Sequence, residues 1–170
     1  MSQATQTEPP FNKEPSALIP PGKSVILFDG VCNMCNGFVN FVIDHDSDQR
    51  FVFCSLQSST GVQILHHYSM PQDLSTMVLI DNNQVYTHST GVLKVLSQLD
   101  GSYQYLGICL YMPEFVRNLG YKTVAHLRYT VFGQSDRCRI CTPALRPRFL
   151  DWNEPKAPVG GVNVNVEKDD

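Results

Sequence analysis

The first part of the chain alternates short apolar runs with stretches in which apolar residues recur at helical spacing. Residues 25–28 and 50–55 are compact, β-prone runs, and the segment between them carries a helical pattern at 38–43. A second helix is predicted at 58–68, where apolar side chains recur every three positions. This order of periodicities is typical of a β-α-β unit followed by a further helix.

The pattern then changes from crossover connections to a hairpin. Residues 76–80 and 84–88 are predicted strands on either side of a short polar turn. Helical spacing returns at 92–99, after Ser89 and Thr90, whose hydroxyls suit a helix N-cap. The predicted order is β-α-β-α-β-β-α, which places the chain in the α/β class.

A C-terminal helical extension is expected after this core. Pro113 follows an apolar stretch at 103–112 and favours the first position of a helix, and helical spacing continues as far as Gly133. Gly120 interrupts that pattern, so we expect a pair of helices that is broken or bent at Gly120.

Composition sets the expected domain boundaries. Residues 1–22 are rich in proline and polar residues and are expected to form a flexible lead. Residues 153–170 hold too few apolar side chains to offset the entropy of ordering, which predicts a mobile tail. One domain is therefore expected over residues 23–152.

Overall composition and charge exclude some classes of function. A hydrophobic content of 42% with 17% charged residues fits a soluble protein with one core. The net charge of -3 does not favour binding to nucleic acid, which usually requires a basic surface. No apolar run reaches the roughly 18 residues of a membrane-spanning helix. No secretory signal is recognisable, which favours a reducing, cytoplasmic location and leaves an organellar one open.

Four of the six cysteines form two Cys-x-x-Cys pairs, Cys32 with Cys35 and Cys138 with Cys141. The first pair lies between a predicted strand and a predicted helix. Residues three apart in a first helical turn share one face and come close enough for a disulfide. The amides and partial positive charge at a helix N-terminus stabilise a thiolate. We therefore expect Cys32 to be the nucleophile and Cys35, deeper in the turn, to be the resolving cysteine.

This arrangement predicts a thiol-disulfide oxidoreductase that needs no cofactor. Its partner would be a protein or a small molecule that carries a disulfide or a dithiol, and electrons could pass in either direction. Arg137 and Arg139 flank Cys138 and would favour a thiolate there as well. Cys138 and Cys141 are therefore a candidate second redox pair.

A hypothesis from a different class uses the same residues. Cys-x-x-Cys is also a common zinc-binding element, and Cys32, Cys35, Cys138 and Cys141 together would complete a four-thiolate zinc site. The chain would then be a non-enzymatic module that binds zinc or docks to a larger assembly. The separation of the pairs far exceeds the roughly 15 to 20 residues of compact zinc ribbons, but folding can bring distant halves together.

The remaining cysteines and one polar run are expected to have structural roles. Cys54 lies in a strand pattern and Cys109 in an apolar stretch, so both are expected to behave as small, packed hydrophobic residues. Residues 44–48, which follow a predicted helix, are expected to form a solvated turn.

The segment 28–36, Phe-Asp-Gly-Val-Cys-Asn-Met-Cys-Asn, resembles the signature of the DCC family of thiol-disulfide oxidoreductase-like proteins, which is named for an aspartate followed by two cysteines. Residues 128–129, 132–133 and 138–143 resemble the C-terminal part of that family. The resemblance covers roughly residues 25–141. It implies a thioredoxin-like fold, which agrees with the predicted order of elements, and a thiol-disulfide oxidoreductase role.

The resemblance also implies that Asp29, Cys32 and Cys35 are the signature positions of the site. Asp29 could accept a proton from Cys35, or it could cap the helix that follows. Both roles place Asp29 beside the dithiol.

The chain departs from thioredoxin itself at two places near the predicted site. Asn33 and Met34 lie between the cysteines, and no tryptophan precedes Cys32, so neither the redox potential nor the docking surface of thioredoxin is transferred. Thioredoxins also carry a cis-proline before the third core strand, and Ser75 and Thr76 occupy that approach here. A polar residue there could permit a metal or cluster to bind at the dithiol.

Overall fold

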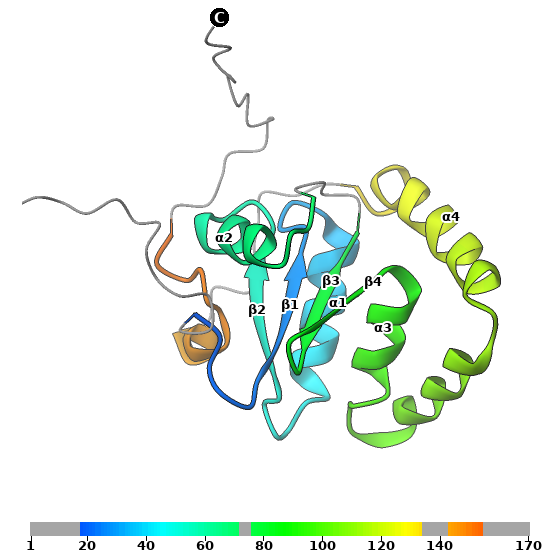
Figure 1. Ribbon diagram of the computed structural model, residues 1–170, viewed down its shortest axis with the longest axis horizontal. Coiled ribbons are helices and arrows are strands. Elements are labelled where there is room, and N and C mark those ends of the chain that lie inside the picture. The colour runs from blue at the N-terminus through cyan, green and yellow to red at the C-terminus, as the bar shows by residue number, and fades with distance from the viewer. Residues whose placement is uncertain (1–17, 72–75, 134–142, 155–170) are drawn as a thin grey trace, which may run out of the picture.

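A four-stranded sheet with the strand order β2-β1-β3-β4 forms the centre of the molecule (Figure 1). The computed structural model describes residues 18–71, 76–133 and 143–154. β1 is parallel to β2 and antiparallel to β3, and β3 is antiparallel to β4. The strands are β1 (Ser24–Phe28), β2 (Phe51–Ser55), β3 (Val78–Asp81) and β4 (Gln84–Thr87).

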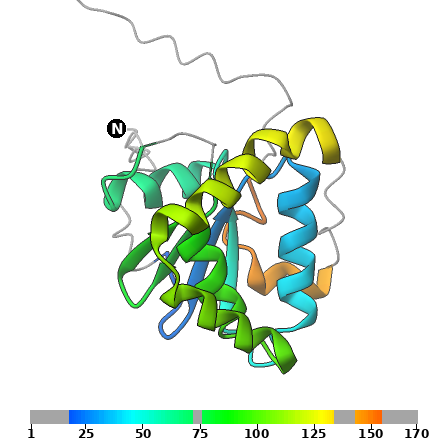
Figure 2. The ribbon, with the colours of Figure 1, turned by 90° about the vertical axis from the view of Figure 1, so that its right-hand side faces the viewer.

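The order β1-α1-β2-α2-β3-β4-α3 confirms the predicted sequence of elements, and with this strand order the fold is thioredoxin-like. The C-terminal extension follows α3 and forms an outer layer over it (Figures 1 and 2). The helices are α1 (Asn33–Asp44), α2 (Ser59–His67), α3 (His88–Leu96), α4 (Glu114–Phe132) and the 3-10 segments η2 (Gly101–Tyr111) and η3 (Pro143–Arg148).

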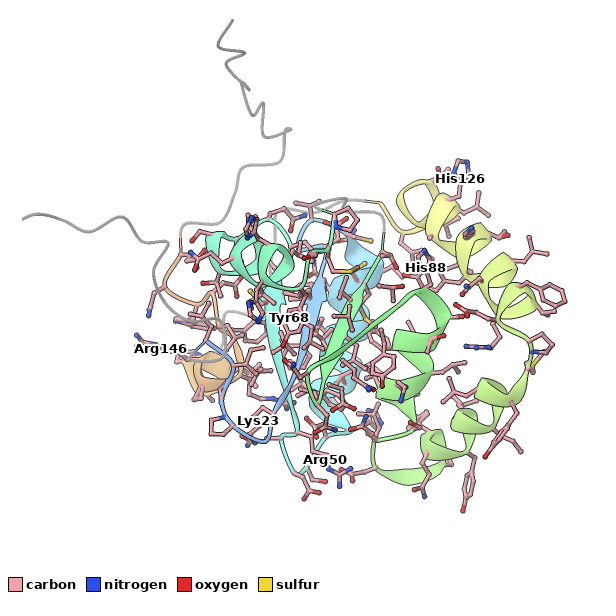
Figure 3. All side chains as sticks on the ribbon, viewed as in Figure 1. Lys23, Arg50, Tyr68, His88, His126 and Arg146 are labelled. Carbon is pink, nitrogen blue, oxygen red and sulfur yellow. The ribbon has the colours of Figure 1, made fainter. Side chains whose placement is uncertain are left out.

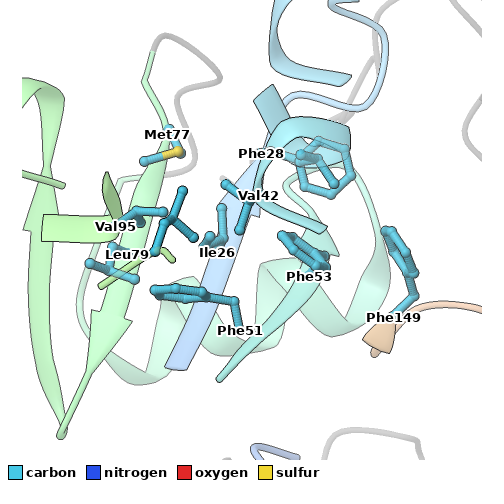
Figure 4. Packing of buried hydrophobic residues seen from close by; sticks show 11 residues of the cluster. Ile26, Phe28, Val42, Phe51, Phe53, Met77, Leu79, Val95 and Phe149 are labelled. Carbon is cyan, nitrogen blue, oxygen red and sulfur yellow. The ribbon is translucent and has the colours of Figure 1, made fainter. Parts of the chain in front are cut away.

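Both faces of the sheet are buried, which explains the continuous apolar runs 25–28 in β1 and 78–80 in β3. On β1, Ile26 and Phe28 belong to one core cluster, and Val25 and Leu27 belong to the other. The first cluster includes side chains of α1, α3 and the segment after η3 (Figure 4). The second cluster includes side chains of α2. The sheet therefore lies between α1 and α3 on one face and α2 on the other.

The hairpin between β3 and β4 confirms the predicted turn. Asn82 and Asn83 have positive φ angles of 48° and 63°. Two-residue hairpin turns of type I′ need this conformation, and asparagine adopts it at lower cost than most residues.

The predicted N-cap of α3 is wrong by a few residues. The N-cap residue is Thr87, and the hydroxyls of Ser89 and Thr90 bind α4 instead. The Ser89 hydroxyl donates to the Asn118 side chain at 2.5 Å, and Arg117 donates to the Thr90 hydroxyl at 3.1 Å. The hydroxyls of Ser89 and Thr90 therefore bind side chains of α4 and do not cap α3.

The predicted break at Gly120 is also wrong, because α4 is one continuous helix. A glycine in a helix interior costs only about 1 kcal/mol relative to alanine, which the contacts of the surrounding turns can offset. The helix ends before Gly133, as predicted, and Gly133 has the positive φ of 69° that a helix terminus favours.

The segment 143–154 returns to the open edge of β2. The Leu150 amide donates to the Phe53 carbonyl at 2.9 Å, and the Ser55 amide donates to the Asp151 carboxylate at 2.9 Å. Glu154 then accepts hydrogen bonds from the main-chain amides of Ser59 and Thr60 at the start of α2. This segment therefore covers the edge of the sheet and caps a helix.

These contacts correct two of the expected boundaries. Asn153 and Glu154, assigned to a mobile tail, are held by hydrogen bonds to Arg146 and α2. Leu18 and Ile19, assigned to a flexible lead, pack against the second core cluster. Residues 1–17 and 155–170 of these segments lie outside the described residues.

The polar run 44–48 is not a simple solvated turn, because Asp46 is buried. Its carboxylate forms a salt bridge with the buried Arg148 and accepts hydrogen bonds from the amides of Arg50 and Phe51. The Arg148 guanidinium also donates to the Phe51 carbonyl. This ion pair joins η3 to the end of α1 and the start of β2.

No helix within the described parts of the chain combines the length and hydrophobicity needed to cross a bilayer.

Candidate redox site at the start of helix α1

β1 and α1 position the first cysteine pair at one end of the sheet. β1 ends at Phe28, and a short loop leads to Cys32, the N-cap residue of α1, with φ of -83° and ψ of 119°. Cys35 lies in the first turn of the helix. The structure thus places the pair where the sequence predicted it, between the first strand and the first helix.

The exposure of the two cysteines differs from the sequence expectation. Cys32 has no exposed surface, whereas Cys35 is partly exposed and packs against the core cluster that contains Phe28 and Met77. We expected Cys35 to be the deeper residue, and the structure has the opposite order.

The C-terminal end of α4 lies against the N-terminal end of α1 (Figure 2). The Asn33 side-chain amide donates to the Phe132 carbonyl at 2.9 Å, and the Asn33 main-chain amide donates to the Gly133 carbonyl at 3.5 Å. The partial negative charge at the end of α4 therefore meets the partial positive charge at the start of α1. Cys32, the residue before Asn33, makes no capping hydrogen bond with its own side chain.

Asp29 organises the loop between β1 and α1. It is only 2% exposed, and its carboxylate accepts hydrogen bonds from the Val31 amide at 3.1 Å and the Gln57 side chain at 2.7 Å. The Gln57 carbonyl oxygen in turn accepts from the Gly30 amide at 3.1 Å. Because Cys32 is the N-cap residue, the expectation that Asp29 caps α1 is wrong. A proton-accepting role for Asp29 stays a prediction.

Asn36 is a further buried polar residue of the site that the sequence analysis missed. Its side chain donates to the Gly30 carbonyl at 2.9 Å, which ties the first turn of α1 to the loop before it. Its Oδ1 atom is buried and has no hydrogen-bond partner in the described structure. The position of Asn36 directly after Cys35 could have marked it as a residue of the site. Gln57 is far from the cysteines in the sequence, so no pattern indicated that it belongs to the site.

The residues before β3 lie at the same end of the sheet as the dithiol. Leu27 pairs with Val78 in antiparallel register, which brings Thr76 and Met77 beside the end of β1. The Tyr121 hydroxyl of α4 lies 2.9 Å from the Thr76 hydroxyl and accepts from the Met77 amide at 3.3 Å. α4 therefore forms hydrogen bonds at two places at this end of the sheet, with Asn33 at the start of α1 and with the residues before β3. Ser75 lies outside the described residues.

The second cysteine pair, Cys138 and Cys141, lies outside the described residues. Within residues 18–71, 76–133 and 143–154, no group of three or more His, Cys, Asp or Glu side chains is arranged to hold a metal ion. Cys54 is buried, as expected, and burial together with the Asp151 charge raises the pKa of its thiol. Cys109 is half-buried in η2.

Comparison with known proteins identifies the family. The model of the DCC1-like thiol-disulfide oxidoreductase family matches residues 26–134. The chain belongs to this family. Its match begins in β1 and ends directly after α4, so the DCC region contains the dithiol, the thioredoxin-like sheet and the contact between α4 and α1.

Two curated relatives cover most of the DCC region. The chain is 41% identical over 127 residues to the uncharacterised protein YuxK of Bacillus subtilis, which covers 74% of this chain and 93% of that protein. It is 42% identical over 120 residues to a chloroplastic DCC family protein of Arabidopsis thaliana, At1g52590, which covers 69% of this chain and 70% of the relative. No solved structure matches the chain significantly.

Proposed function

We propose that this DCC-family protein exchanges electrons with disulfides through Cys32 and Cys35. The observation that carries the proposal is the position of Cys32 as the N-cap residue of α1, with Cys35 in the first turn of the same helix. Helix N-termini stabilise negative charge on sulfur, and a thiolate is the species that attacks a disulfide.

The proposed reaction has two steps. The Cys32 thiolate attacks one sulfur of a substrate disulfide, which forms a mixed disulfide and releases the other substrate sulfur as a thiolate. Cys35 then attacks the Cys32 sulfur, which forms the Cys32–Cys35 disulfide and releases the second substrate thiolate. Two electrons pass from the dithiol to the substrate, and the two cysteine protons end on the two substrate thiols. A thiol reductant such as glutathione returns the dithiol to its reduced form, and the reverse sequence oxidises a substrate.

Other residues would support this chemistry in distinct ways. Asp29 is buried beside the loop and would accept the proton of Cys35 when Cys35 attacks. Asn33 holds the end of α4 over the start of α1, so the substrate would reach Cys32 when this contact opens. No cofactor takes part in the proposed reaction.

The substrate class stays broad, as a protein or a small molecule with a disulfide or dithiol. The family name supports the reaction type, and the chloroplastic relative makes an organellar location as compatible with the family as a cytoplasmic one. The zinc hypothesis would use Cys32, Cys35, Cys138 and Cys141 together, and the same experiment separates the two proposals.

Differential alkylation with mass spectrometry across a graded glutathione buffer, with and without a strong zinc chelator, tests the proposal. The expected result is reversible pairing of Cys32 with Cys35 that the chelator does not change, and the midpoint gives the potential of the pair. If Cys32, Cys35, Cys138 and Cys141 become reactive only with chelator, the protein is a metal-binding module and the redox proposal fails.

A further inference from the structure

Asn33 carries two hydrogen-bond donors directly after Cys32, and both of them bind main-chain carbonyls. The side-chain amide donates to the Phe132 carbonyl at 2.9 Å, and the main-chain amide donates to the Gly133 carbonyl at 3.5 Å. The two acceptors are consecutive carbonyls of the chain. The residue beside the proposed nucleophile therefore binds a short stretch of peptide main chain, which here comes from the end of α4.

The main-chain donor of Asn33 has no partner within its own helix. The first amides of an α-helix lie beyond the reach of the intrahelical hydrogen bonds, and Asn33 is the first residue of α1. This amide is therefore open to an acceptor from outside the helix. The side-chain amide adds a second donor of the same kind beside it, and a peptide carbonyl satisfies either one.

Little apolar burial holds the last turn of α4 against Asn33. Val131 and Phe132 are 65% and 52% exposed, and Thr130 is exposed as well. The Asn33 side chain also lies at the surface, so water competes for both partners of its hydrogen bond to Phe132. A hydrogen bond of this kind adds little net free energy. Another peptide can therefore replace residues 132–133 at small cost.

α4 has a second attachment at this end of the sheet that does not involve Asn33. The Tyr121 hydroxyl accepts a hydrogen bond from the Met77 amide at 3.3 Å, and the Tyr121 ring packs edge-on against His88 with centroids 5.5 Å apart. His88 lies on the inner side of α4, whereas His126 points outward from that helix (Figure 3). Tyr121 thus anchors α4 without using the donors of Asn33.

We propose that Asn33 binds main-chain carbonyls of a peptide substrate, and that residues 132–133 occupy its donors until the substrate replaces them. The inference rests on the proposed disulfide exchange and names its substrate class, a disulfide within a polypeptide. A cysteine in a polypeptide has carbonyls on its own residue and on the residue before it, and consecutive residues are only about 3.8 Å apart. Attack by Cys32 on the sulfur of that cysteine brings these carbonyls to Asn33.

The end of α4 and a peptide substrate compete for the same donors, whereas a small disulfide without carbonyls needs only access to Cys32. Removal of the Asn33 side chain therefore has two effects. It frees the end of α4, which raises the fraction of reactive molecules for every disulfide. It also removes a hydrogen bond to the substrate, which slows the reaction with peptides alone. The ratio of the rate constants for a peptide disulfide and a non-peptide disulfide isolates this second effect.

Single-turnover kinetics of the reduced full chain test the proposal. One substrate is the disulfide of N-acetylcysteine N-methylamide, which has amide carbonyls on both sides of each cysteine, and the other is hydroxyethyl disulfide, which has none. Asn33→Ala is expected to react roughly fivefold faster with hydroxyethyl disulfide and at about the wild-type rate with the peptide disulfide. Its ratio is thus expected to fall roughly fivefold. Differences in leaving-group reactivity cancel when the ratios of two proteins are compared.

Two further variants test whether the lost donor is the cause. Asn33→Asp keeps the shape of the side chain but replaces its donor nitrogen by an acceptor, so its ratio is expected to fall at least as far. Tyr121→Phe removes the other attachment of α4 and leaves both donors of Asn33 in place. It is expected to change both rate constants by the same factor and to keep the wild-type ratio. Circular dichroism of each variant confirms that the fold is intact.

The outcomes separate this inference from the exchange reaction on which it rests. Wild-type ratios in Asn33→Ala and Asn33→Asp would overturn the inference and leave the exchange reaction standing. A ratio that falls as far in Tyr121→Phe as in Asn33→Ala would also overturn it, because release of α4 would then account for the change. Wild-type protein that reacts with neither disulfide would overturn the proposed function together with the inference.

Discussion

The Asn33 side-chain amide donates a 2.9 Å hydrogen bond to the Phe132 carbonyl and fastens the last turn of α4 to the first turn of α1. The two residues are far apart in sequence but join two helix ends of opposite polarity. Cys32 directly precedes Asn33 and is fully buried. We therefore expect access to the Cys32 sulfur to depend on the position of α4, which binds the next residue.

Removing this hydrogen bond should make Cys32 more reactive. A hydrogen bond contributes about 1 kcal/mol net, so Asn33→Ala is expected to raise the population with α4 displaced, and the alkylation rate of Cys32, by roughly fivefold. The rate is measured by mass spectrometry after timed exposure to iodoacetamide. Asn153→Ala is the matched control, because it removes an amide that binds Arg146 elsewhere on the molecule. An unchanged Cys32 rate in Asn33→Ala would mean that another contact buries the sulfur.

The elements that the sequence predicted well are those fixed by local pattern. Apolar runs gave the strands, because both faces of the sheet are buried, and the position of Cys32 between a strand and a helix could be read from the same pattern. The asparagine pair at 82–83 indicated its own turn. These features depend on residues close together in the chain.

The features that the sequence missed depend on distant partners. Asp46 looked like part of a solvated turn, and it is buried only because Arg148 reaches it from η3. A helix cap was one of two roles expected for Asp29, but its carboxylate instead accepts a hydrogen bond from the Gln57 side chain. The contact between Asn33 and the end of α4 joins residues that are 99 positions apart, and no local pattern encodes it. Polar pairings of this kind have no periodicity to reveal them.

The buried ion pair predicts a large effect on stability. Arg148→Met would leave the Asp46 carboxylate buried without its partner charge, and the expected loss is about 3 to 5 kcal/mol of unfolding free energy. Urea unfolding measures it. The control is Arg50→Met, whose ion pair with Asp48 is exposed and is expected to contribute no more than about 1 kcal/mol. Equal losses in the two variants would contradict the structural role of the buried pair.

The carboxylates of Glu154 and Asp151 should change the free energy of unfolding in opposite directions as pH falls, because their pKa values are shifted in opposite directions. Burial tends to raise the pKa of Glu154, but hydrogen bonds from Thr60 and Ser59 outweigh it and hold the pKa below its usual value. Its contribution is present above the unfolded-state pKa and is lost as pH falls through the folded-state pKa. Glu154→Gln should therefore be less stable than wild type at neutral pH, and the difference should shrink on acidification.

Asp151 provides the comparison, because burial raises the pKa of its carboxyl. A raised folded-state pKa means that the folded state binds a proton more tightly, so this contribution is present below the unfolded-state pKa and is lost as pH rises through the folded-state pKa. Relative to Asp151→Asn, wild type should gain stability as pH falls through this window. Urea unfolding across a pH series measures both variants, and parallel pH profiles would contradict the two assignments.

Close packing between α2 and β2 makes Gly61 sensitive to substitution. A Cβ atom at Gly61 would lie 2.1 Å from the Ser55 carbonyl oxygen, so Gly61→Ala must push the helix away from the strand. The expected cost is at least about 1 to 3 kcal/mol. Gly120→Ala is the control, since a Cβ there meets nothing within 4 Å and is expected to stabilise α4 by about 0.4 to 1 kcal/mol. Thermal unfolding that ranks the two variants the other way would refute this packing.

The order of attack at the dithiol can be read from trapped intermediates. If Cys32 is the nucleophile, Cys35→Ser exposed to glutathione disulfide should retain one glutathione on Cys32, because the residue that would release it is absent. Cys32→Ser should acquire little under the same conditions, although Cys35 is the more exposed thiol. Peptide mass spectrometry locates the adduct. Faster modification of Cys35 in Cys32→Ser than of Cys32 in Cys35→Ser would reverse the two roles, because exposure would then outweigh the stabilisation that the start of α1 offers to a thiolate.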